Sequence, residues 1–292
     1  LSYGLTSCWD AARKRPDVAL VFNVANGFWL PLLRARQVPT VVNVDGIEWR
    51  RAKWNRLAKT VFRLGARASA KWATRLVCDS SAIADFWAAE LGRGGEVIAY
   101  GADSPETDLP VEPGLAHRAY ALVVARFVPE NSIPEFFEAA PAIARQHDVV
   151  IVGSGAGELD AQAAALADAN PRIRWLGHIA DDRRLFSLWQ HAGAYFHGHS
   201  VGGTNPALVQ AMACGAPTVA RDTVFTREVL ADAGRFTSPE PTAIAQAVTA
   251  LLSDPDAQDQ LSARAVRRAH EAYSWARINS QYDQLLRQAL DS

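Results

Sequence analysis

A run of glycines and small polar residues between residues 198 and 206 has the composition of an anion-binding loop. Gly202 and Gly203 can turn backbone N–H groups toward a ligand, and Thr204 and Asn205 add polar side chains. The apolar spacing that follows predicts a short helix, whose N-terminus would bring its positive dipole end to the same point. Diphosphate is an anion that such a loop suits, so the run predicts a phosphate site. A surface turn before an ordinary core helix has the same local pattern.

One arginine stands where a phosphate-binding cation is expected. Arg126 directly follows the apolar run 120–125, at the carboxyl end of a predicted strand. A guanidinium there can bind a phosphate through two hydrogen bonds and stabilise charge that develops on a leaving diphosphate. We therefore interpret Arg126 as catalytic; the alternative is a surface arginine paired with Glu130. Asn131 lies close by and can add a hydrogen bond but no charge.

Other titratable side chains also follow predicted strands. His197 and His199 precede the glycines, and we interpret His199, which is nearer to them, as catalytic, although a lone histidine is more often structural. Asp45 and Glu48 follow the apolar run 40–44. A carboxylate at Asp45 can orient or deprotonate an acceptor hydroxyl. The glycine after Asp45 makes a plain turn the alternative interpretation.

Four segments together resemble the family 4 retaining glycosyltransferases, which have the GT-B fold of two facing Rossmann-like domains. The glycine-rich loop, in its Ser-Val-Gly-Gly-Thr-Asn-Pro form, is similar to that of the rhamnosyltransferase-like branch. The other three segments are 43–49, 125–131 and 225–229, and they stand in the order that the family has. Four motifs in order are more specific than one glycine-rich turn, and the resemblance extends along the whole chain.

The resemblance implies roles for particular residues. Those implied to bind the nucleotide-sugar donor are Asn131, Gly202, Gly203, Thr204, Asn205, Gln210 and Glu228. Asn131 stands where many relatives have a lysine, and Gln210 where they usually have a glutamate that binds the ribose hydroxyls. Glu228 either binds donor hydroxyls or caps the helix that runs into Val229. Asp45 stands where many relatives carry a histidine near the reacting centre, with Glu48 and Trp49 on the acceptor side of the same loop.

The composition of the chain excludes several classes of protein. The 292 residues permit two domains, and a formal net charge of −1 argues against a nucleic-acid-binding protein that acts through overall charge. Cys8, Cys78 and Cys214 lie far apart and lack zinc-ligand spacing, which argues against disulfides and predicts a reducing, cytoplasmic setting. No apolar run is long enough to span a bilayer. Because the strand–glycine-loop–helix unit that opens the family's first domain is missing before Val18, we expect a truncated N-terminal domain.

Alternating strand-like and helical runs predict two doubly wound α/β domains, with ligands in a cleft at the carboxyl ends of their strands. The expected strands are 18–22, 40–44, 75–79, 96–98, 120–124, 148–152, 173–176, 194–196 and 217–220. We assign residues 1–104 to a partial acceptor-side domain and 118–273 to the donor-binding domain. A proline-rich, acidic linker occupies 105–117. The resemblance implies that the last helix, within 274–292, packs back on the first domain.

A basic, amphipathic helix is predicted between residues 54 and 75. Its cations Arg56, Lys59, Arg63 and Arg67 fall on one side of a helical wheel. Leu57 and Leu64 are assigned to the opposite side, which we expect to face the core. The basic side either rests on an anionic membrane surface, where it would bring the enzyme to a lipid-linked acceptor, or is simply solvated.

The sequence thus predicts a hexosyltransferase that moves a sugar from a nucleoside diphosphate to a glycan or lipid-linked acceptor. The resemblance implies a rhamnosyl group and retention of configuration. The resemblance implies that no bound metal or other cofactor is needed, and no carboxylate pair such as D-x-D follows a predicted strand to contradict this. The rival is a non-catalytic nucleotide- or glycan-binding relative, motivated by Gln210. A nicotinamide enzyme is a third choice, because the glycine pattern after Val152 has Glu158 in place of its last glycine.

Overall fold

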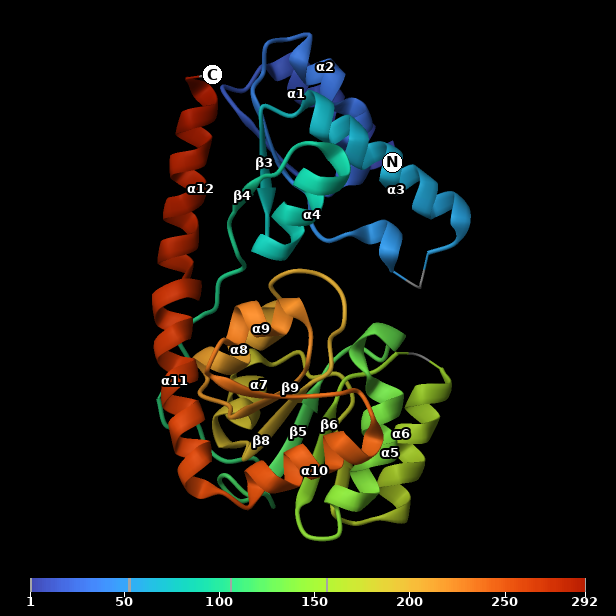
Figure 1. Cartoon of the computed structure of the whole chain (residues 1–292), viewed down its shortest axis with the longest axis vertical. Coiled ribbons are helices and arrows are strands. Elements are labelled where there is room, and N and C mark those ends of the chain that lie inside the picture. The colour runs from blue at the N-terminus through green and yellow to red at the C-terminus, as the bar shows by residue number, and fades with distance from the viewer. Residues whose placement is uncertain (1, 52–53, 106, 156, 292) are drawn as a thin grey trace. The chain divides into compact units, whose positions relative to one another are not determined.

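The computed structural model describes residues 2–51, 54–105, 107–155 and 157–291, and the chain forms two compact units (Figure 1). Unit 1 consists of Leu1–Tyr100, Val201–Thr204 and Trp275–Ser292, and unit 2 of Gly101–Ser200 and Asn205–Ser274. Each unit has a parallel sheet with helical crossovers. The predicted α/β class with two Rossmann-like domains is confirmed.

Unit 1 is built on a parallel sheet with the strand order β1-β2-β3-β4. The strands are β1 (Ala19–Phe22), β2 (Thr40–Asn43), β3 (Arg75–Cys78) and β4 (Glu96–Val97). The helices before the last are α1 (Ser2–Lys14), η1 (Val24–Trp29), α2 (Leu30–Arg34), η2 (Glu48–Arg50), α3 (Arg56–Trp72) and α4 (Ser81–Leu91). Every residue of β2 is buried, as expected for a central strand covered on both faces.

The last helix, α12 (Trp275–Leu290), belongs to unit 1. Its apolar residues Ile278, Leu285 and Ala289 form one buried cluster with Val41 of β2 and Val77 of β3. The hydroxyl of Tyr282, on the same helix, accepts a hydrogen bond of 2.7 Å from the side chain of Asn43. Helix α12 thus covers one face of the sheet and reaches its carboxyl end.

Helix α3 packs closely against η1 through residues that have small side chains or none. A Cβ at Gly65 would lie 2.4 Å from the carbonyl oxygen of Val24, and one at Gly27 would lie 2.2 Å from that of Gly65. The buried side of α3 is therefore the side of Gly65, Ala66 and Ser69. The expectation that Leu57 and Leu64 face the core is wrong: they are 75% and 46% exposed.

Unit 2 is built on a parallel sheet with the strand order β10-β9-β8-β5-β6-β7. The strands are β5 (Tyr120–Val124), β6 (Asp148–Val152), β7 (Ile173–Trp175), β8 (Ala194–His197), β9 (Thr218–Arg221) and β10 (Gly234–Thr237). The helices are η3 (Pro129–Asn131), α5 (Ile133–Ile143), α6 (Glu158–Ala169), α7 (Asp182–His191), α8 (Pro206–Ala213), α9 (Val224–Leu230), α10 (Pro241–Leu252) and α11 (Pro255–Tyr273). Strand β10 was not expected, because Gly-Arg-Phe-Thr has no apolar run.

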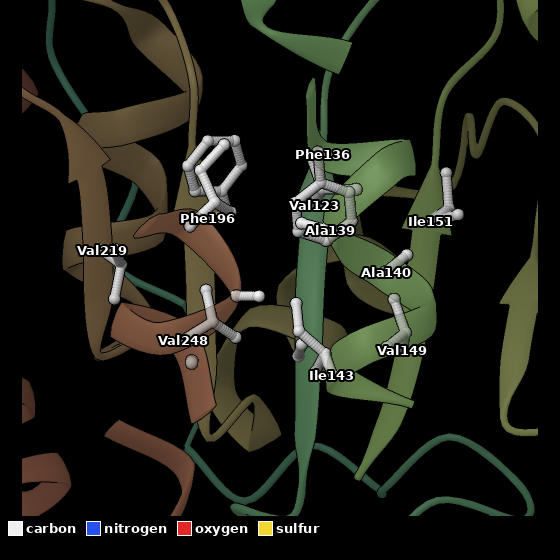
Figure 2. Packing of buried hydrophobic residues seen from close by; sticks show 14 of the residues in the cluster. Val123, Phe136, Ala139, Ala140, Ile143, Val149, Ile151, Phe196, Val219 and Val248 are labelled. Atoms are coloured by element: carbon white, nitrogen blue, oxygen red, sulfur yellow. The ribbon is translucent and has the colours of Figure 1, made fainter. Parts of the chain in front are cut away.

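The core of unit 2 lies between its sheet and helices α5 and α10 (Figure 2). Phe136 of α5 and Phe196 of β8 stack with their ring centroids 5.2 Å apart. Valines and isoleucines of β5 and β6, among them Val123 and Ile151, pack beside them. This packing holds β5, β6 and β8 side by side, so that their carboxyl ends meet at one edge.

Three segments group differently from the expected domains. Residues 101–104, which we expected in the first domain, belong to unit 2. The described part of the expected linker, residues 105–117, belongs to unit 2. Arg184 of α7 forms an ion pair with Glu112, and Arg174 of β7 donates to the carbonyl oxygen of Pro113 at 3.0 Å. Residues 201–204 group with unit 1, whereas we expected them with the donor-binding domain.

Replacing Gly65 by alanine tests the close packing of α3 on η1. Because the new methyl group would overlap the Val24 carbonyl oxygen, the helix must move, and we expect the free energy of unfolding to fall by about 1–3 kcal/mol. Urea unfolding followed by circular dichroism measures this change. Gly94→Ala is the matched control, because its Cβ would lie 3.4 Å from its nearest neighbour. Equal stabilities of the two variants would contradict the packing described.

Candidate donor site in unit 2

A cavity of about 620 Å³ opens at the carboxyl ends of β5, β6 and β8. The sheet order changes direction between β5 and β8, because β6 and β7 continue on one side of β5 while β8, β9 and β10 continue on the other. Parallel α/β sheets bind their ligands at such a switch point. The polar residues that line the cavity are Arg126, Asn131, Ser154, His178, His197, His199 and Asn205.

Arg126 lines this cavity two residues after β5, and it is exposed. Among the described residues no carboxylate forms an ion pair or hydrogen bond with its guanidinium. The expected alternative partner, Glu130, is 8% exposed, and neither of its carboxylate oxygens has a hydrogen-bond partner. The interpretation of Arg126 as a surface arginine paired with Glu130 is therefore wrong, and its charge is available to a ligand in the cavity.

Asn131 and His199 are joined by a hydrogen bond across the ends of β5 and β8. The Oδ1 atom of Asn131 lies 2.6 Å from Nδ1 of His199, and its Nδ2 donates to the carbonyl oxygen of Arg126 at 2.8 Å. Both polar atoms of Asn131 are thus occupied within the protein. Asn131 connects two other residues of the cavity wall, which the sequence did not predict.

His197 lies at the end of β8 and is buried at the cavity wall. Its Nδ1 is 3.1 Å from the hydroxyl of Tyr195, and its Nε2 has no hydrogen-bond partner. Burial, followed by the charge of His199, lowers the pKa of His197 to about 3. Burial also raises the pKa of Tyr195. At neutral pH both groups are therefore uncharged, and His197 adds no cation to the cavity.

The N-terminus of α8 is already capped. The Oδ1 atom of Asn205 accepts a hydrogen bond of 2.9 Å from the amide of Ala207, and Pro206 has no N–H to offer. The amide of Leu208 donates to the backbone oxygen of Asn205. The helix can therefore offer an anion in the cavity its dipole rather than these amides.

The glycines of the loop make their close contacts within unit 1. Gly202 has a φ of 109°, which favours glycine, and a Cβ at Gly203 would lie 2.0 Å from Oδ1 of Asp79. The amide of Thr204 donates to the carbonyl oxygen of Asp79 at 3.3 Å. The Thr204 hydroxyl donates to the same oxygen. These three residues do not line the cavity of unit 2. No feature of the sequence marked Asp79 as their neighbour.

Gln210 is bound to the backbone of Asp103. Its Oε1 accepts from the Asp103 amide at 2.9 Å, and its Nε2 donates to the Asp103 carbonyl oxygen at 3.0 Å. An amide matches this pair of groups, whereas a carboxylate can only accept. Gln210 does not line the cavity, so the structure gives it a partner other than a ribose.

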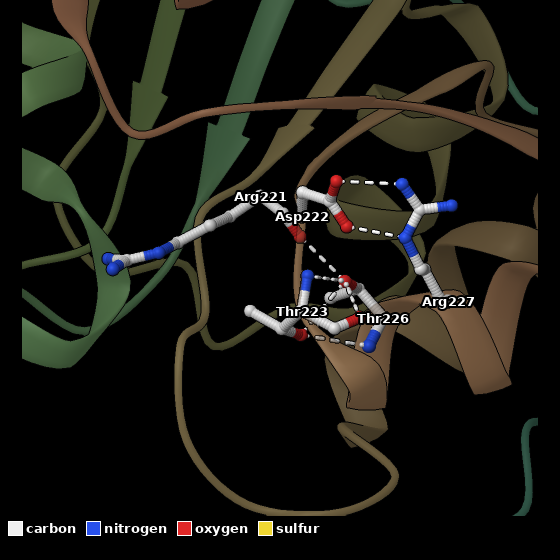
Figure 3. Close-up of polar contacts among 5 residues, drawn as sticks. All are labelled: Arg221, Asp222, Thr223, Thr226 and Arg227. Atoms are coloured by element: carbon white, nitrogen blue, oxygen red, sulfur yellow. Dashed lines mark hydrogen bonds and ion pairs between the residues drawn. The ribbon is translucent and has the colours of Figure 1, made fainter.

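Glu228 lies in α9, and it does not cap that helix. Figure 3 shows that Thr223 and Thr226 form the capping box instead, with the Thr226 amide donating to the Thr223 hydroxyl at 3.1 Å. The expectation that Glu228 serves as a helix cap is therefore wrong. Its implied contact with a donor sugar stays a prediction, because Glu228 is not part of the cavity wall.

In unit 1, Asp45 occupies a tight turn after β2. Its φ is 59°, its amide donates to Oδ1 of Asn43 at 2.8 Å, and its Oδ2 accepts from Nδ2 of Asn23 at 3.2 Å. This conformation leaves the carboxylate half-buried and oriented, and its role toward an acceptor stays a prediction. Burial, followed by the charges of Asp45 and Asp79, raises the pKa of Tyr100 to about 12, which keeps its hydroxyl protonated.

Glu48 and Trp49 stabilise this loop through buried contacts with other residues of unit 1. Glu48 is buried, forms an ion pair of 2.7 Å with Arg51 and accepts from the indole of Trp54 at 2.8 Å. Trp49 is buried against Phe86, with their ring centroids 6.0 Å apart. Both side chains are buried, so neither presents much surface to an acceptor, and their implied acceptor-side role stays a prediction.

Metal-ligand clusters and membrane-spanning helices are both absent from the residues that the structure describes. Nowhere in these residues do three or more histidine, cysteine, aspartate or glutamate side chains gather in a group that could hold a metal ion. None of the helices formed by them has the length and apolar character needed to cross a membrane.

Comparison with known proteins adds two family matches. Residues 118–254 match the model described as glycosyl transferases group 1, and residues 4–103 match a domain of unknown function, DUF1972. Phosphatidyl-myo-inositol mannosyltransferase of Mycolicibacterium smegmatis is 31% identical over 201 residues, which are 66% of this chain and 50% of the relative. O-antigen chain mannosyltransferase B of Escherichia coli is 27% identical over 187 residues, or 61% and 49%. These matches span about half the length of the curated relatives.

Solved structures show the same fold over nearly the whole chain. Anabaena HepE in complex with UDP matches with a TM-score of 0.79 and 18% identity, over 98% of this chain and 82% of that one. An alpha,alpha-trehalose-phosphate synthase from Burkholderia xenovorans matches with a TM-score of 0.80 and 12% identity, over 98% and 78%. The chain thus has the α/β fold of GT-B glycosyltransferases, and its residues 118–254 match the family model described as glycosyl transferases group 1.

Proposed function

We propose that this protein transfers a hexosyl group from a nucleoside-diphosphate sugar to a glycan or lipid-linked acceptor, with retention of configuration. The observation that carries the proposal is the cavity at the switch point of unit 2, where Arg126 and His199 come together from neighbouring strands. The names of the relatives agree with it, since both curated proteins are called mannosyltransferases and the HepE structure holds UDP.

In the proposed reaction the bond between the sugar and the diphosphate breaks while the acceptor oxygen bonds to the same face of the sugar. Arg126 stabilises the charge that develops on the diphosphate, and a phosphate oxygen helps to take the acceptor proton. Asp45 orients or deprotonates the acceptor hydroxyl. No bound metal takes part in this scheme.

The sugar is proposed only as a hexose. The donor loop resembles that of rhamnosyltransferases, whereas the curated relatives are named for mannose. Both sugars are 6-carbon units joined to a nucleoside diphosphate, and the choice between them depends on contacts that a donor complex would reveal. Assays should therefore include GDP-mannose and dTDP-rhamnose.

Arg126→Ala tests the role of the guanidinium. Loss of this contact should lower kcat/KM by about tenfold to a thousandfold, which corresponds to about 1.4–4 kcal/mol of transition-state stabilisation. Steady-state kinetics with the preferred donor measures the effect, and calorimetry should show weaker binding of the free nucleoside diphosphate. Arg145→Ala, an exposed arginine beyond the end of α5, is the control. Wild-type kinetics in Arg126→Ala would remove this residue from the mechanism.

A non-catalytic relative is the second candidate function, and Gln210 is the observation that favours it. A relative that has lost its ribose-binding glutamate should gain turnover in Gln210→Glu. We expect the opposite, because a carboxylate would face the Asp103 carbonyl oxygen and lose the donor bond of Nε2.

We therefore expect Gln210→Glu to gain no turnover and to lose about 0.5–1.5 kcal/mol in the free energy of unfolding, the net contribution of one hydrogen bond. Thermal unfolding and a transferase assay measure the two quantities. Gln260→Glu, on the exposed side of α11, is the matched control. Increased turnover in Gln210→Glu would instead support the non-catalytic relative.

We further propose that the exposed face of α3 rests on an anionic membrane surface near a lipid-linked acceptor. Arg56, Arg63 and Arg67 are exposed there, and Leu57 and Leu64 lie beside them on the same face of the helix. Cations attract anionic headgroups, while exposed leucines can enter the interface. The exposure of both leucines supports this role over a merely solvated basic face.

Reversing the three arginines to glutamate should reduce binding to anionic vesicles by roughly fivefold or more per residue, since each nearby cation contributes about 1 kcal/mol. Cosedimentation with phosphatidylglycerol vesicles measures it. The double variant Leu57→Ser, Leu64→Ser should also bind less, and this loss should persist at high salt. Reversal of the exposed arginines at 145, 267 and 277 is the control. Unchanged sedimentation of the triple variant would exclude the α3 face.

A further inference from the structure

A second cavity, of about 300 Å³, lies in unit 1 between α3 and α4. Arg67, Ala70 and Lys71 of α3 line one side of it, and Glu90 and Leu91 of α4 line the other. Because positions 67, 70 and 71 are three and four residues apart, they share one side of the helix. Arg67 also belongs to the exposed basic face of α3, so the cavity continues that face toward the C-terminus of the helix.

The two cations of this cavity are not neutralised within the protein. Arg67 and Lys71 are exposed, and among the described residues no carboxylate forms an ion pair with either of them. The Lys71 ammonium lies 4.8 Å from the centroid of the Trp72 ring, a contact that leaves its charge in place. Glu90 is exposed as well. The cavity therefore offers a ligand two positive groups on one side and one carboxylate on the other.

The C-terminus of α3 does not oppose an anion in this cavity. A helix ends in a partial negative charge on its last carbonyl groups, which would repel an anion if nothing covered them. Nη1 of Arg93 donates to the carbonyl oxygens of Ala70 and Ala73, both at 2.8 Å, and its Nη2 donates to that of Thr74 at 2.8 Å. Burial, followed by the charge of Arg75, lowers the pKa of Arg93, whose guanidinium still stays protonated at neutral pH.

These groups match a ligand that carries both a phosphodiester and hydroxyl groups. Arg67 and Lys71 can each donate hydrogen bonds to phosphate oxygens. The Glu90 carboxylate can only accept, so it suits a hydroxyl and would repel a second phosphate. The glycerol headgroup of an anionic phospholipid has this composition. Leu57 and Leu64, which are exposed on α3, can enter the lipid interface while a headgroup occupies the cavity.

We propose that this cavity binds the headgroup of an anionic phospholipid, with Arg67 and Lys71 on the phosphodiester and Glu90 on the headgroup hydroxyls. The inference rests on the proposed contact of the α3 face with a membrane, and it adds a selective site to that contact. A merely basic face attracts all lipids of equal charge to the same extent. The cavity instead distinguishes lipids of equal charge by their hydroxyl groups.

Vesicle binding by Glu90→Ala separates these two cases. Cosedimentation in about 0.15 M salt, which screens distant charges, compares phosphatidylglycerol with phosphatidylmethanol. Both lipids carry one negative charge, but only the first has headgroup hydroxyls. The wild type should bind phosphatidylglycerol roughly threefold to tenfold more tightly, the scale of one hydrogen bond. Glu90→Ala should bind phosphatidylglycerol more weakly than the wild type does and phosphatidylmethanol slightly more tightly, because a negative charge is removed.

Asp85→Ala is the matched control, because Asp85 is an exposed carboxylate of α4 that does not line the cavity. This variant should keep the wild-type preference for phosphatidylglycerol. Lys71→Gln should weaken binding to both lipids by roughly fivefold, since a cation near the surface contributes about 1 kcal/mol.

Two results overturn the headgroup site while the membrane contact of α3 stands. One is equal binding of the two lipids by the wild type, and the other is tighter binding of phosphatidylglycerol by Glu90→Ala, as a merely basic face predicts. Failure of the wild type to bind either kind of vesicle overturns the membrane contact as well. The proposed transfer reaction is tested separately, with a water-soluble acceptor and no vesicles.

Discussion

The pairing of β5 with β8 is the constraint on which the candidate site depends. These strands are neighbours in space but far apart in the chain, and the sheet order reverses between them. Loops that leave neighbouring strands in opposite directions leave a crevice at the edge of the sheet. Stacking of Phe136 on Phe196 fixes the packing beneath that crevice, and Arg126, Asn131, His197 and His199 lie at or beyond the carboxyl ends of these two strands.

Some polar groups around the cavity form hydrogen bonds within the protein, and others are available to bind a ligand. Asn131, Asn205 and Gln210 use their amides on protein partners, and the first two also lie at the cavity wall. No carboxylate among the described residues pairs with the Arg126 guanidinium, so its positive charge is available to a ligand in the cavity. In unit 1, Glu48 likewise pairs with Arg51 of its own loop. The Asp45 carboxylate accepts a hydrogen bond from Asn23 and is half-buried. A polar residue at a strand end is therefore not a ligand contact by position alone.

The alternation of strand and helix runs was enough to predict two α/β units, since all the expected strands formed. The sequence did not predict β10, because pairing with β9 stabilises a segment that has no apolar run of its own. A helical wheel shows which residues of α3 share a face, but the face that is buried was decided by Gly65 and Gly27, whose lack of side chains lets the helix approach η1. Arg126, Asn131, His199 and Asn205 were all named from the sequence and all line one cavity. The contacts of Gln210 with Asp103 and of Gly203 with Asp79 join residues more than 100 positions apart, and no local pattern encodes them.

The most direct test of the account is a crystal structure of the protein with a nucleoside diphosphate. We expect the diphosphate to lie at the carboxyl ends of β5 and β8, within hydrogen-bonding distance of the Arg126 guanidinium and the His199 ring. A nucleotide bound elsewhere on unit 2, or one at this cavity whose phosphates touch neither residue, would contradict the central claim.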